Sequence, residues 1–339
     1  MGAGQPCFVI AEAGVNHNGD IALAHRLVEE AARAGANAVK FQTFKTERLV
    51  TRNAPTAAYQ KRATAGVESQ FELLKRLELT REMHRELIAD CVSRDLIFLS
   101  SPFEEESADE LIELEVKALK IPSGELTNWP FLHHVARKQI PVIFSTGMSS
   151  MEEVERAVEI FRSAGNEQLV LLHCVSNYPA NPAECNLRAM QTLERRFNVP
   201  VGFSDHTEGI EIAAAAVALG ACVIEKHFTL DCSLSGPDHQ ASLEPDELAA
   251  MIRRIRLVES ALGNGEKIPA ASERDTAEVA RKSVVAALDI PSDTIIIAEM
   301  LTMKRPGTGL AAEMLPQLIG RRSLQPIAGG TLIAREMLS

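Results

Sequence analysis

The sequence predicts a closed parallel α/β barrel of eight strand–helix units followed by a small second domain. Eight short apolar runs alternate with helical patterns over about 260 residues, the size expected of a (β/α)₈ barrel. Most of these runs end in polar residues, as expected where a barrel builds its site at the carboxyl ends of its strands. An open doubly wound sheet is the alternative, but eight units in unbroken alternation favour closure.

The elements follow one another in a regular order along the chain. Runs rich in apolar residues predict strands at 7–14, 37–43, 96–102, 118–125, 141–147, 169–176, 200–203 and 221–224. Amphipathic periodicity predicts helices at 20–34, 80–94, 104–115, 128–138, 150–164, 186–197, 209–219 and 244–262. Residues 44–69 show no clear periodicity after the second strand, and we expect them to act as a lid, with a mobile surface loop without a chemical role as the alternative.

The barrel pattern ends near Leu262, which divides the chain into a catalytic domain at 1–262 and two further segments. Residues 263–278 are polar and glycine-containing, as expected of a linker. Residues 279–339 contain short strands and turns. A domain of that size is marginal alone and should dock on the barrel or on a partner chain.

Composition excludes several classes of function. The net charge of −11 and an aromatic content of 4% argue against nucleic-acid binding, which needs a basic face and stacking side chains. No apolar run approaches the roughly 20 residues of a membrane span. The amino terminus lacks the features of a secretory signal, and the six scattered cysteines form no CxxC pair. We therefore expect a cytoplasmic enzyme with reduced thiols.

Two histidines follow neighbouring strands near the end of the barrel, in Ser204-Asp205-His206 and Glu225-Lys226-His227. Each stands near an acidic residue that could orient its ring. Neutral imidazoles suit Mn²⁺, Fe²⁺, Co²⁺ or Zn²⁺, and two ligands leave positions open for water or substrate. The spacing predicts an open metal site, with isolated structural histidines as the alternative.

Three lysines interrupt apolar runs, where an unpaired ammonium would be costly. Lys40, Lys120 and Lys226 should therefore meet carboxylates or a bound anion in the barrel mouth, with purely structural internal ion pairs as the alternative, above all for Lys226. Glu12, Glu125 and Glu225 are the expected partners. Hydroxyls at five strand tips would complete a phosphate pocket around a lysine; they belong to Ser101, Ser123, Ser145, Ser176 and Ser204. Asp238, in the turn after the eighth strand, could reach over the site.

The chain resembles the sialic acid synthase family along its whole length. The strings that carry the resemblance are IAEAGVNHNGD (10–20), AVKFQTF (38–44), LKIPSGE (119–125), STGM (145–148), SDHTEGIEIAAAAVALGACVIEKHFTLD (204–231) and GPDHQASLEPDEL (236–248). In the tail, RKSVVA (281–286) and KRPGTG (304–309) resemble the antifreeze-like (SAF) domain of that family.

The resemblance implies an aldol-like condensation of phosphoenolpyruvate with N-acetylmannosamine and water, giving N-acetylneuraminate and phosphate. It implies a divalent ion on His206 and His227, Mn²⁺ first and Mg²⁺ or Co²⁺ as alternatives, that polarises the aldehyde of the open-chain sugar. It also implies that Arg305 reaches the N-acyl group of the sugar on the barrel of a partner subunit, in a domain-swapped homodimer.

The resemblance assigns roles to the remaining candidates. Lys40 and Gln42 would lie at the carboxylate of phosphoenolpyruvate. Its phosphate would be held by Lys120 with Ser101, Ser123, Ser145 and Ser204. Glu12 and Glu125 would move protons, and Tyr178 and Asp238 would bind the sugar chain. Ser176 stands where bacterial sialic acid synthases have an asparagine that contacts phosphoenolpyruvate.

Other functions remain open, the first within the family that the chain resembles and the others on the residues alone. A synthase for N,N'-diacetyllegionaminate would use 2,4-diacetamido-2,4,6-trideoxymannose and shares the SGELTN string (123–128). A Schiff-base aldolase would use Lys120 or Lys226 as the nucleophile. A non-catalytic binding module is the third alternative, although it would not need a barrel with charged strand tips.

Overall fold

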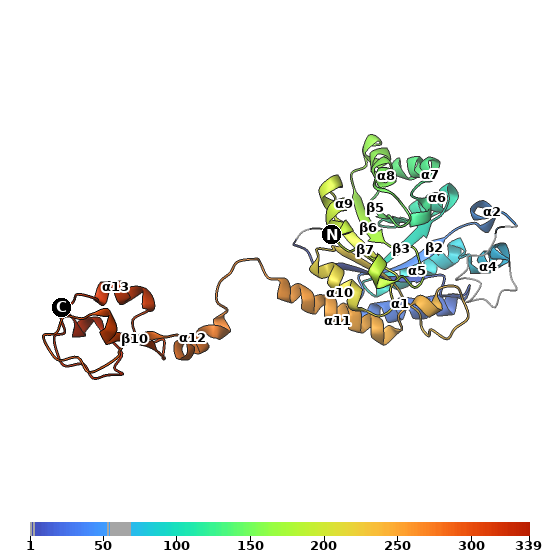
Figure 1. Ribbon diagram of the computed structural model, residues 1–339. Coiled ribbons are helices and arrows are strands. Elements are labelled where there is room, and N and C mark those ends of the chain that lie inside the picture. The colour runs from blue at the N-terminus through green and yellow to red at the C-terminus, as the bar shows by residue number, and fades with distance from the viewer. Residues whose placement is uncertain (1, 3, 53, 55–68) are drawn as a thin grey trace. The chain divides into compact units, whose positions relative to one another are not determined.

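A computed structural model describes residues 2, 4–52, 54 and 69–339, and in it the chain divides into two compact units, Met1–Gly263 and Asn264–Ser339. The first unit is a ring of parallel strands surrounded by helices (Figure 1). Its strands are β1 (Phe8–Gly14), β2 (Ala38–Thr43), β3 (Ile97–Pro102), β4 (Leu119–Ile121), β5 (Val142–Ser145), β6 (Leu169–Cys174), β7 (Val201–Asp205) and β8 (Val223–His227).

The strand order shows a nearly closed barrel. It runs β3-β2-β1-β8-β7-β6-β5-β4, so the first and last strands of the barrel pair with each other, and all neighbours in this order are parallel. Strands β3 and β4 are in contact at the remaining seam. The predicted (β/α)₈ fold is confirmed, and the open doubly wound sheet is not what the chain forms.

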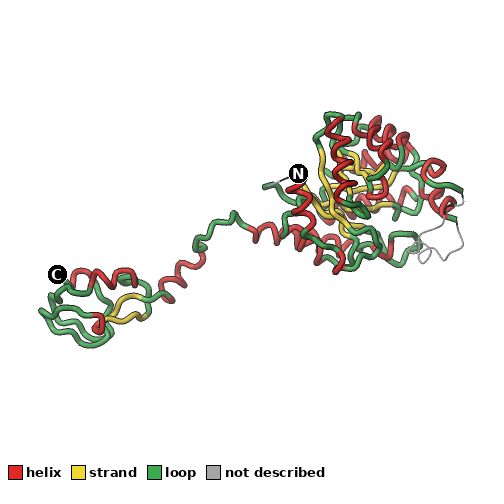
Figure 2. The backbone as a smooth tube through the Cα atoms, turned by 45° about the horizontal axis from the view of Figure 1, so that its top comes forward, coloured by secondary structure: helices red, strands yellow, loops and turns green. Residues whose placement is uncertain are grey.

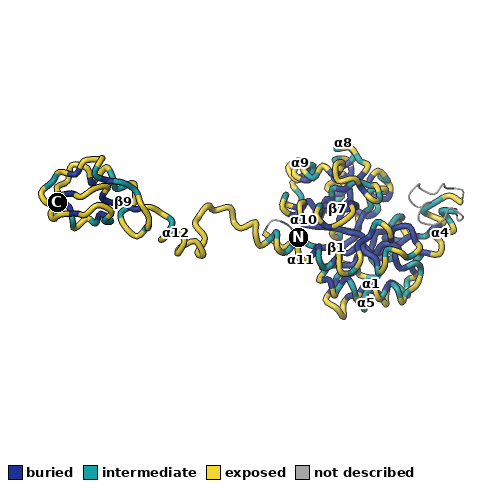
Figure 3. The backbone as a smooth tube through the Cα atoms, turned by 60° about the horizontal axis from the view of Figure 1, so that its bottom comes forward, coloured by how far each residue is buried: buried dark blue, intermediate teal, exposed yellow. Residues whose placement is uncertain are grey.

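Helices cover the outside of the barrel. They are α1 (Ile21–Ala34), α5 (Arg81–Ser93), α6 (Glu105–Glu113), α7 (Trp129–Ala136), α8 (Met151–Ser163), α9 (Ala189–Phe197), α10 (Glu211–Ala218) and α11 (Pro245–Leu262). Their apolar sides pack on the strands and their polar sides face solvent, so burial is concentrated at the centre of the unit (Figure 3). Each helix lies within a predicted helical range.

The barrel interior has an apolar layer beneath a polar one. Ile10, Ala38, Leu99, Ile143 and Val223 belong to one buried cluster inside the ring. Two residues further along the same strands stand Glu12, Lys40, Ser101, Ser145 and Glu225. Because side chains two apart in a strand point the same way, the strands turn these polar groups toward the carboxyl-end mouth of the barrel.

Two short helices lie between β2 and α5, the first within residues 44–69, for which no periodicity was expected, and the second just after them. They are α2 (Thr46–Leu49) and α4 (Gln70–Leu77). Ser69 and Glu72 form a capping box that begins α4, since each side chain accepts from the main-chain N–H of the other. The central part of the predicted lid, residues 53 and 55–68, lies outside the described residues.

The second unit is small and rich in loops (Figure 2). It contains α12 (Arg274–Ala280), α13 (Leu315–Leu318) and the antiparallel strands β9 (Ser283–Ala286) and β10 (Leu301–Lys304). A buried cluster that includes Val284, Ile296 and Ile333 forms its core. No helix among the described residues is long and apolar enough to cross a bilayer.

Candidate active site at the barrel mouth

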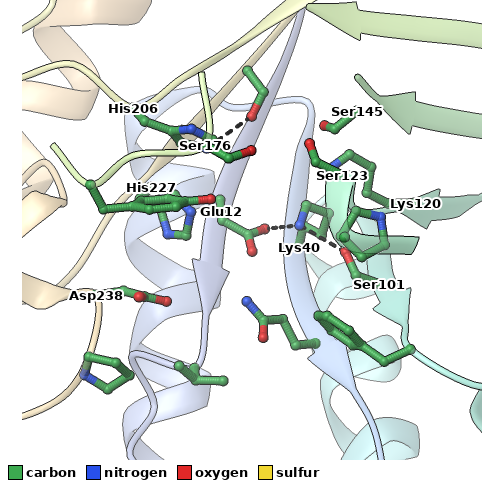
Figure 4. Close-up of a pocket in the computed structure, with 18 of the residues that line it drawn as sticks. Glu12, Lys40, Ser101, Lys120, Ser123, Ser145, Ser176, His206, His227 and Asp238 are labelled. Atoms are coloured by element: carbon green, nitrogen blue, oxygen red, sulfur yellow. Dashed lines mark hydrogen bonds and ion pairs between the residues drawn. The ribbon is translucent and has the colours of Figure 1, made fainter. Parts of the chain in front are cut away.

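A cavity of about 390 Å³ opens at the carboxyl ends of the barrel strands. Thirteen of the predicted site residues line it: Glu12, Lys40, Gln42, Ser101, Lys120, Ser123, Ser145, Ser176, Tyr178, Ser204, His206, His227 and, from the turn after β8, Asp238. Figure 4 shows two halves, with His206, His227 and Asp238 on one side and the lysines with three serines on the other. Residues from distant parts of the chain therefore share one site.

Buried charges form a network across the floor of this cavity. The Lys40 Nζ lies 2.5 Å from Glu12 Oε2 and 3.8 Å from Glu225 Oε2, and it donates to Ser101 Oγ at 3.0 Å. The Lys120 Nζ donates to Glu225 Oε1 at 2.9 Å. The two ammonium groups thus share one carboxylate, which leaves donor capacity for an anionic ligand.

Burial and these neighbours shift the pKa values in opposite directions. Burial is the largest influence on Glu12 and raises its pKa, against the attraction of Lys40. Burial also acts to raise the pKa of Glu225, but the ammonium groups of Lys120 and Lys40 outweigh it and the pKa is lowered. Burial lowers the pKa of Lys120. One carboxyl group is thereby suited to carry a proton and the other to stay ionised.

The serines surround the lysine half of the cavity. Ser145 Oγ is buried and has no hydrogen-bond partner within the described part of the chain, as expected of a group aimed at a ligand. The Gly147 N–H donates to Ser123 Oγ at 3.0 Å. A Cβ at Gly147 would collide with Ser176 Oγ and lie 2.8 Å from Cys174 Sγ, so this close approach requires glycine.

The two histidines face each other with ring centroids 5.6 Å apart. His206 Nδ1 donates to the Val175 carbonyl at 2.7 Å, so the lone pair of the neutral ring lies on Nε2. Nε2 is 3.3 Å from Ser204 Oγ, whose own proton is donated to Glu225. Burial lowers the pKa of His206 to about 4 and that of His227 well below its usual range. Both rings are therefore neutral and able to ligate a metal.

The residues fit an open metal site with two protein ligands. His227 Nδ1 is buried without a hydrogen-bond partner among the described groups. No cluster of three or more histidine, cysteine or acidic side chains placed to hold an ion occurs in the described ranges. A metal bound here would consequently take its other ligands from water or substrate.

Asp238 and Tyr178 lie on the histidine side of the cavity. Burial raises the pKa of Asp238 to about 6, with Lys40 opposing the shift. The Tyr178 ring lies 4.2 Å from the His206 ring and edge-on to His227 at 5.5 Å, measured between centroids. These groups are positioned to contact a polar molecule beside the histidines.

Two predicted site residues, Glu125 and Arg305, lie elsewhere. Glu125 sits in a short 3₁₀ helix (Ser123–Glu125), does not line the cavity, and accepts from Asn128 Nδ2 at 2.7 Å. Arg305 belongs to the second unit, where its Nε donates to the Ala280 carbonyl at 3.0 Å. The roles predicted for these two residues stay predictions.

Lys226 corrects the expectation that all three lysines point into the mouth. Its Nζ pairs with Asp205 at 2.9 Å, and it does not line the cavity. The reason is strand alternation: Lys226 stands between Glu225 and His227, which point inward, and therefore points outward. Lys226 is consequently not available as a Schiff-base nucleophile in this site.

Sequence reasoning missed part of the cavity lining. Glu225 was expected only as a partner for a lysine, yet it is the central carboxylate; its spacing of two from His227 was the available signal. The outer wall is largely apolar and was not predicted; it consists of Val15, Leu49, Val50, Leu73, Leu74, Leu77, Phe103, Met148 and Pro237. The capping box before α4 was the signal for the helix that supplies three of these residues.

Comparisons with known proteins agree with this arrangement. The NeuB family model matches residues 27–267, and the SAF domain model matches residues 281–339. The chain is 47% identical to an N,N'-diacetyllegionaminic acid synthase of Legionella pneumophila over 99% of this chain and 95% of that one. It is 48% identical to the synthase of the same name from Campylobacter jejuni, over 93% and 95%.

Solved structures show the same fold. An N-acetylneuraminic acid synthetase from Leptospira borgpetersenii, crystallised with citrate, superposes with a TM-score of 0.72 at 39% identity. The match covers 81% of this chain and 91% of that one.

Proposed function

This chain belongs to the NeuB family, and we propose that it condenses phosphoenolpyruvate with an N-acylated mannose-type sugar and water to give a nonulosonic acid and phosphate. The observation that carries the proposal is the two-sided cavity. One side offers two buried ammonium groups and several hydroxyls to a phosphorylated acid, and the other offers two neutral imidazoles beside groups that suit a polyol.

The lysine half supports binding of phosphoenolpyruvate. Lys120, with Ser101, Ser123, Ser145 and Ser204, would hold the phosphate, and Lys40 and Gln42 would meet the carboxylate. Ammonium and hydroxyl donors to phosphate and carboxylate oxygens make strong charge-assisted hydrogen bonds, more so where burial excludes water. Ser176 lines the same region and would contact the anion in place of an asparagine.

The histidine half supports activation of the sugar. His206 and His227 would hold a divalent ion, Mn²⁺ first, which when bound supplies polarisation of the open-chain aldehyde. Carbon 3 of phosphoenolpyruvate then forms a bond to the aldehyde carbon, water adds at carbon 2, and phosphate leaves. Glu12, with its raised pKa, would take up and return protons at the water and the new hydroxyl.

Between the two sugars left open by the sequence, we favour 2,4-diacetamido-2,4,6-trideoxymannose over N-acetylmannosamine. The two legionaminic acid synthases named above are similar over nearly the whole chain. The outer wall offers half-buried apolar side chains, including Leu49, Leu74 and Phe103, to a C6 methyl and a 4-acetamido methyl. Chain extension away from the aldehyde would bring that end of the sugar toward the wall.

The same wall argues against a sugar 6-phosphate. Lys40 and Lys120 are the cations among the described residues that line the cavity, and both are committed to carboxylates at its floor. A second phosphate near the apolar wall would lose its hydration without gaining a cationic partner.

Phosphate release separates these possibilities. The full chain with MnCl₂ and phosphoenolpyruvate is given N-acetylmannosamine, its 6-phosphate or the diacetamido sugar, and the product mass is recorded. We expect the highest kcat/KM with the diacetamido sugar, and Leu74→Asn should reduce that preference about tenfold, as for one methyl-sized contact. Preference for the 6-phosphate would refute the choice of sugar, and no release with any sugar would refute the reaction.

Location and assembly complete the proposal. Six free cysteines in the described structure suit a reducing compartment, so we place the enzyme in the cytoplasm. We also propose the domain-swapped homodimer implied by the family resemblance, with Arg305 of one chain serving the barrel of its partner.

A further inference from the structure

Beside the two histidines lies a buried ion pair that the proposed reaction does not use. Asp205 ends β7 and Lys226 lies on β8, and the two are register partners across the strand pair. Their side chains are 0% and 1% exposed. Each is the direct chain neighbour of one histidine, Asp205 of His206 and Lys226 of His227.

The pair closes a small network around His206. Lys226 Nζ donates to Asp205 Oδ2 at 2.9 Å and to the Thr207 carbonyl at 2.5 Å. Asp205 Oδ1 accepts from the Thr207 N–H at 2.9 Å and from its hydroxyl at 2.7 Å. Residues on both sides of His206 are thus tied to the side chain that precedes His227. We call Asp205, Thr207 and Lys226 the tip bridge.

The tip bridge acts from the outer face of the strands and touches no ligand. Alternation sends Asp205 and Lys226 away from the cavity while His206 and His227 face it. Two buried charges carry a desolvation penalty that a pair of apolar side chains would avoid. Stability alone therefore gives little reason for charges here, whereas directional hydrogen bonds fix the relative position of two strand tips.

The histidines differ in how else they are held. The ring of His206 donates to the Val175 carbonyl, and its main-chain carbonyl accepts from the Ala180 N–H at 2.8 Å. The ring of His227 packs against the rings of Tyr178 and His206, but its Nδ1 has no hydrogen-bond partner among the described groups. Its main-chain carbonyl accepts from the Leu243 N–H at 2.9 Å. With no hydrogen bond to that ring nitrogen, its placement relative to His206 depends on how β8 lies against its neighbours β7 and β1.

We propose that the tip bridge is a positioning device that sets the distance and orientation of His206 and His227 for one divalent ion. This inference rests on the metal site proposed above. Groups that orient metal ligands without touching the metal commonly change its affinity about 10- to 100-fold when altered. The tip bridge would set the metal affinity by fixing the ends of β7 and β8, without contacting the imidazole rings themselves.

The test is to measure Mn²⁺ binding by the full chain. Titration calorimetry gives the Kd, and loss of the free Mn²⁺ signal in electron paramagnetic resonance checks it. The informative variant is the double substitution Asp205→Asn with Lys226→Met. Asparagine can still accept from Thr207, methionine replaces the lysine stem, and no unpaired charge is buried. We expect the Kd for Mn²⁺ to rise at least about tenfold, with kcat at saturating Mn²⁺ changing less.

A control separates positioning from general loss of stability. Val158→Ala removes buried apolar contact on α8 and leaves the strand tips intact. At an equal drop in the Tm of the metal-free protein, Val158→Ala should bind Mn²⁺ as the wild type does, and the double variant should not. A wild-type Kd in the folded double variant would overturn the positioning role.

A second pair of variants tests the metal site itself. If His206→Ala and His227→Ala abolish Mn²⁺ binding while the double variant binds normally, the metal site holds and the tip bridge inference fails. If the histidine variants bind Mn²⁺ like the wild type, the proposed site is wrong.

Discussion

Lys120 shows most directly how burial changes the properties of a lysine side chain. It is 3% exposed, bonded to Glu225, and its pKa is lowered by burial. Such a group can donate hydrogen bonds to a bound anion or, in a Schiff-base aldolase, act as the nucleophile. The serines around it and the neutral histidines opposite favour the first role.

Substituting Lys120 tests that role. Lys120→Met should lower kcat/KM for phosphoenolpyruvate roughly 100-fold, because removing one buried charged partner costs about 3 kcal/mol. Initial rates of phosphate release measure this. The control is Lys138→Met, which removes the ion pair of Lys138 with Asp109 on the outside of the barrel. Borohydride with pyruvate should leave the wild type active and unmodified; a trapped adduct on Lys120 would favour the aldolase.

His17 is a second residue whose burial has a measurable consequence. Its side chain is fully buried, its Nδ1 accepts from the Gly19 N–H at 3.0 Å, and burial lowers its pKa to about 4. The unfolded chain binds a proton near pH 6.5, whereas the folded chain does so only near pH 4. Stability is therefore complete above pH 6.5 and is lost as pH falls toward 4.

The expected loss is about 3 kcal/mol from His17 alone across that window. His17→Asn keeps an acceptor for the Gly19 N–H and removes the titrating imidazole. The free energy of unfolding of this variant should therefore fall less steeply than that of the wild type as pH is lowered. Urea titrations followed through Trp129, the one tryptophan of the chain and part of the barrel, measure this. Parallel curves for the two proteins would contradict the assignment.

At the scale of elements, local pattern predicted most of the barrel. Each of the eight helices that cover the barrel lies within a predicted helical range and each strand overlaps a predicted apolar run, because both patterns report burial of one or two faces. Strands β7 and β8 extend beyond the predicted 200–203 and 221–224, to Asp205 and His227, so polar residues expected after these strands belong to them. The fourth strand was expected over 118–125 but ends at Ile121. Pro122 has no N–H to continue the ladder, and Ser123–Glu125 turn into a 3₁₀ helix.

The loop after β5 gives an element-scale prediction. Gly147 lies so close to Ser123 and Ser176 that a methyl group must displace them. Gly147→Ala should raise the KM for phosphoenolpyruvate about tenfold or more, since misplacing positioning groups by about 1 Å is costly. The Tm should change little by comparison. A normal KM with a lowered Tm would place the effect in packing and not in the site.

At the scale of the whole molecule, the question is what the second unit contributes. It has its own buried core, and the chain divides between Gly263 and Asn264. The family resemblance alone places its Arg305 at the sugar of a partner subunit. That prediction concerns assembly, so it needs a test in which two chains are distinguished.

Mixed assemblies provide it. Arg305→Ala and His227→Ala are each expected to be weakly active, and co-refolding equal amounts should restore roughly a quarter of wild-type activity if sites are shared in a dimer. Half of the dimers would then be mixed, and one site in each would carry neither substitution. Additive, unrestored activity after confirmed mixing would refute the shared site.

The sequence by itself determined the order of elements, the two-part organisation and most of the polar side of the cavity, because residues two apart in a strand and adjacent strand tips have predictable neighbours. It also carried the family resemblance. Only the tertiary structure decided which buried charges pair. Lys40 and Lys120 share Glu225 inside the barrel, whereas Lys226 turns outward to Asp205, and three lysines in similar apolar runs are told apart only by the face that each strand presents to the interior.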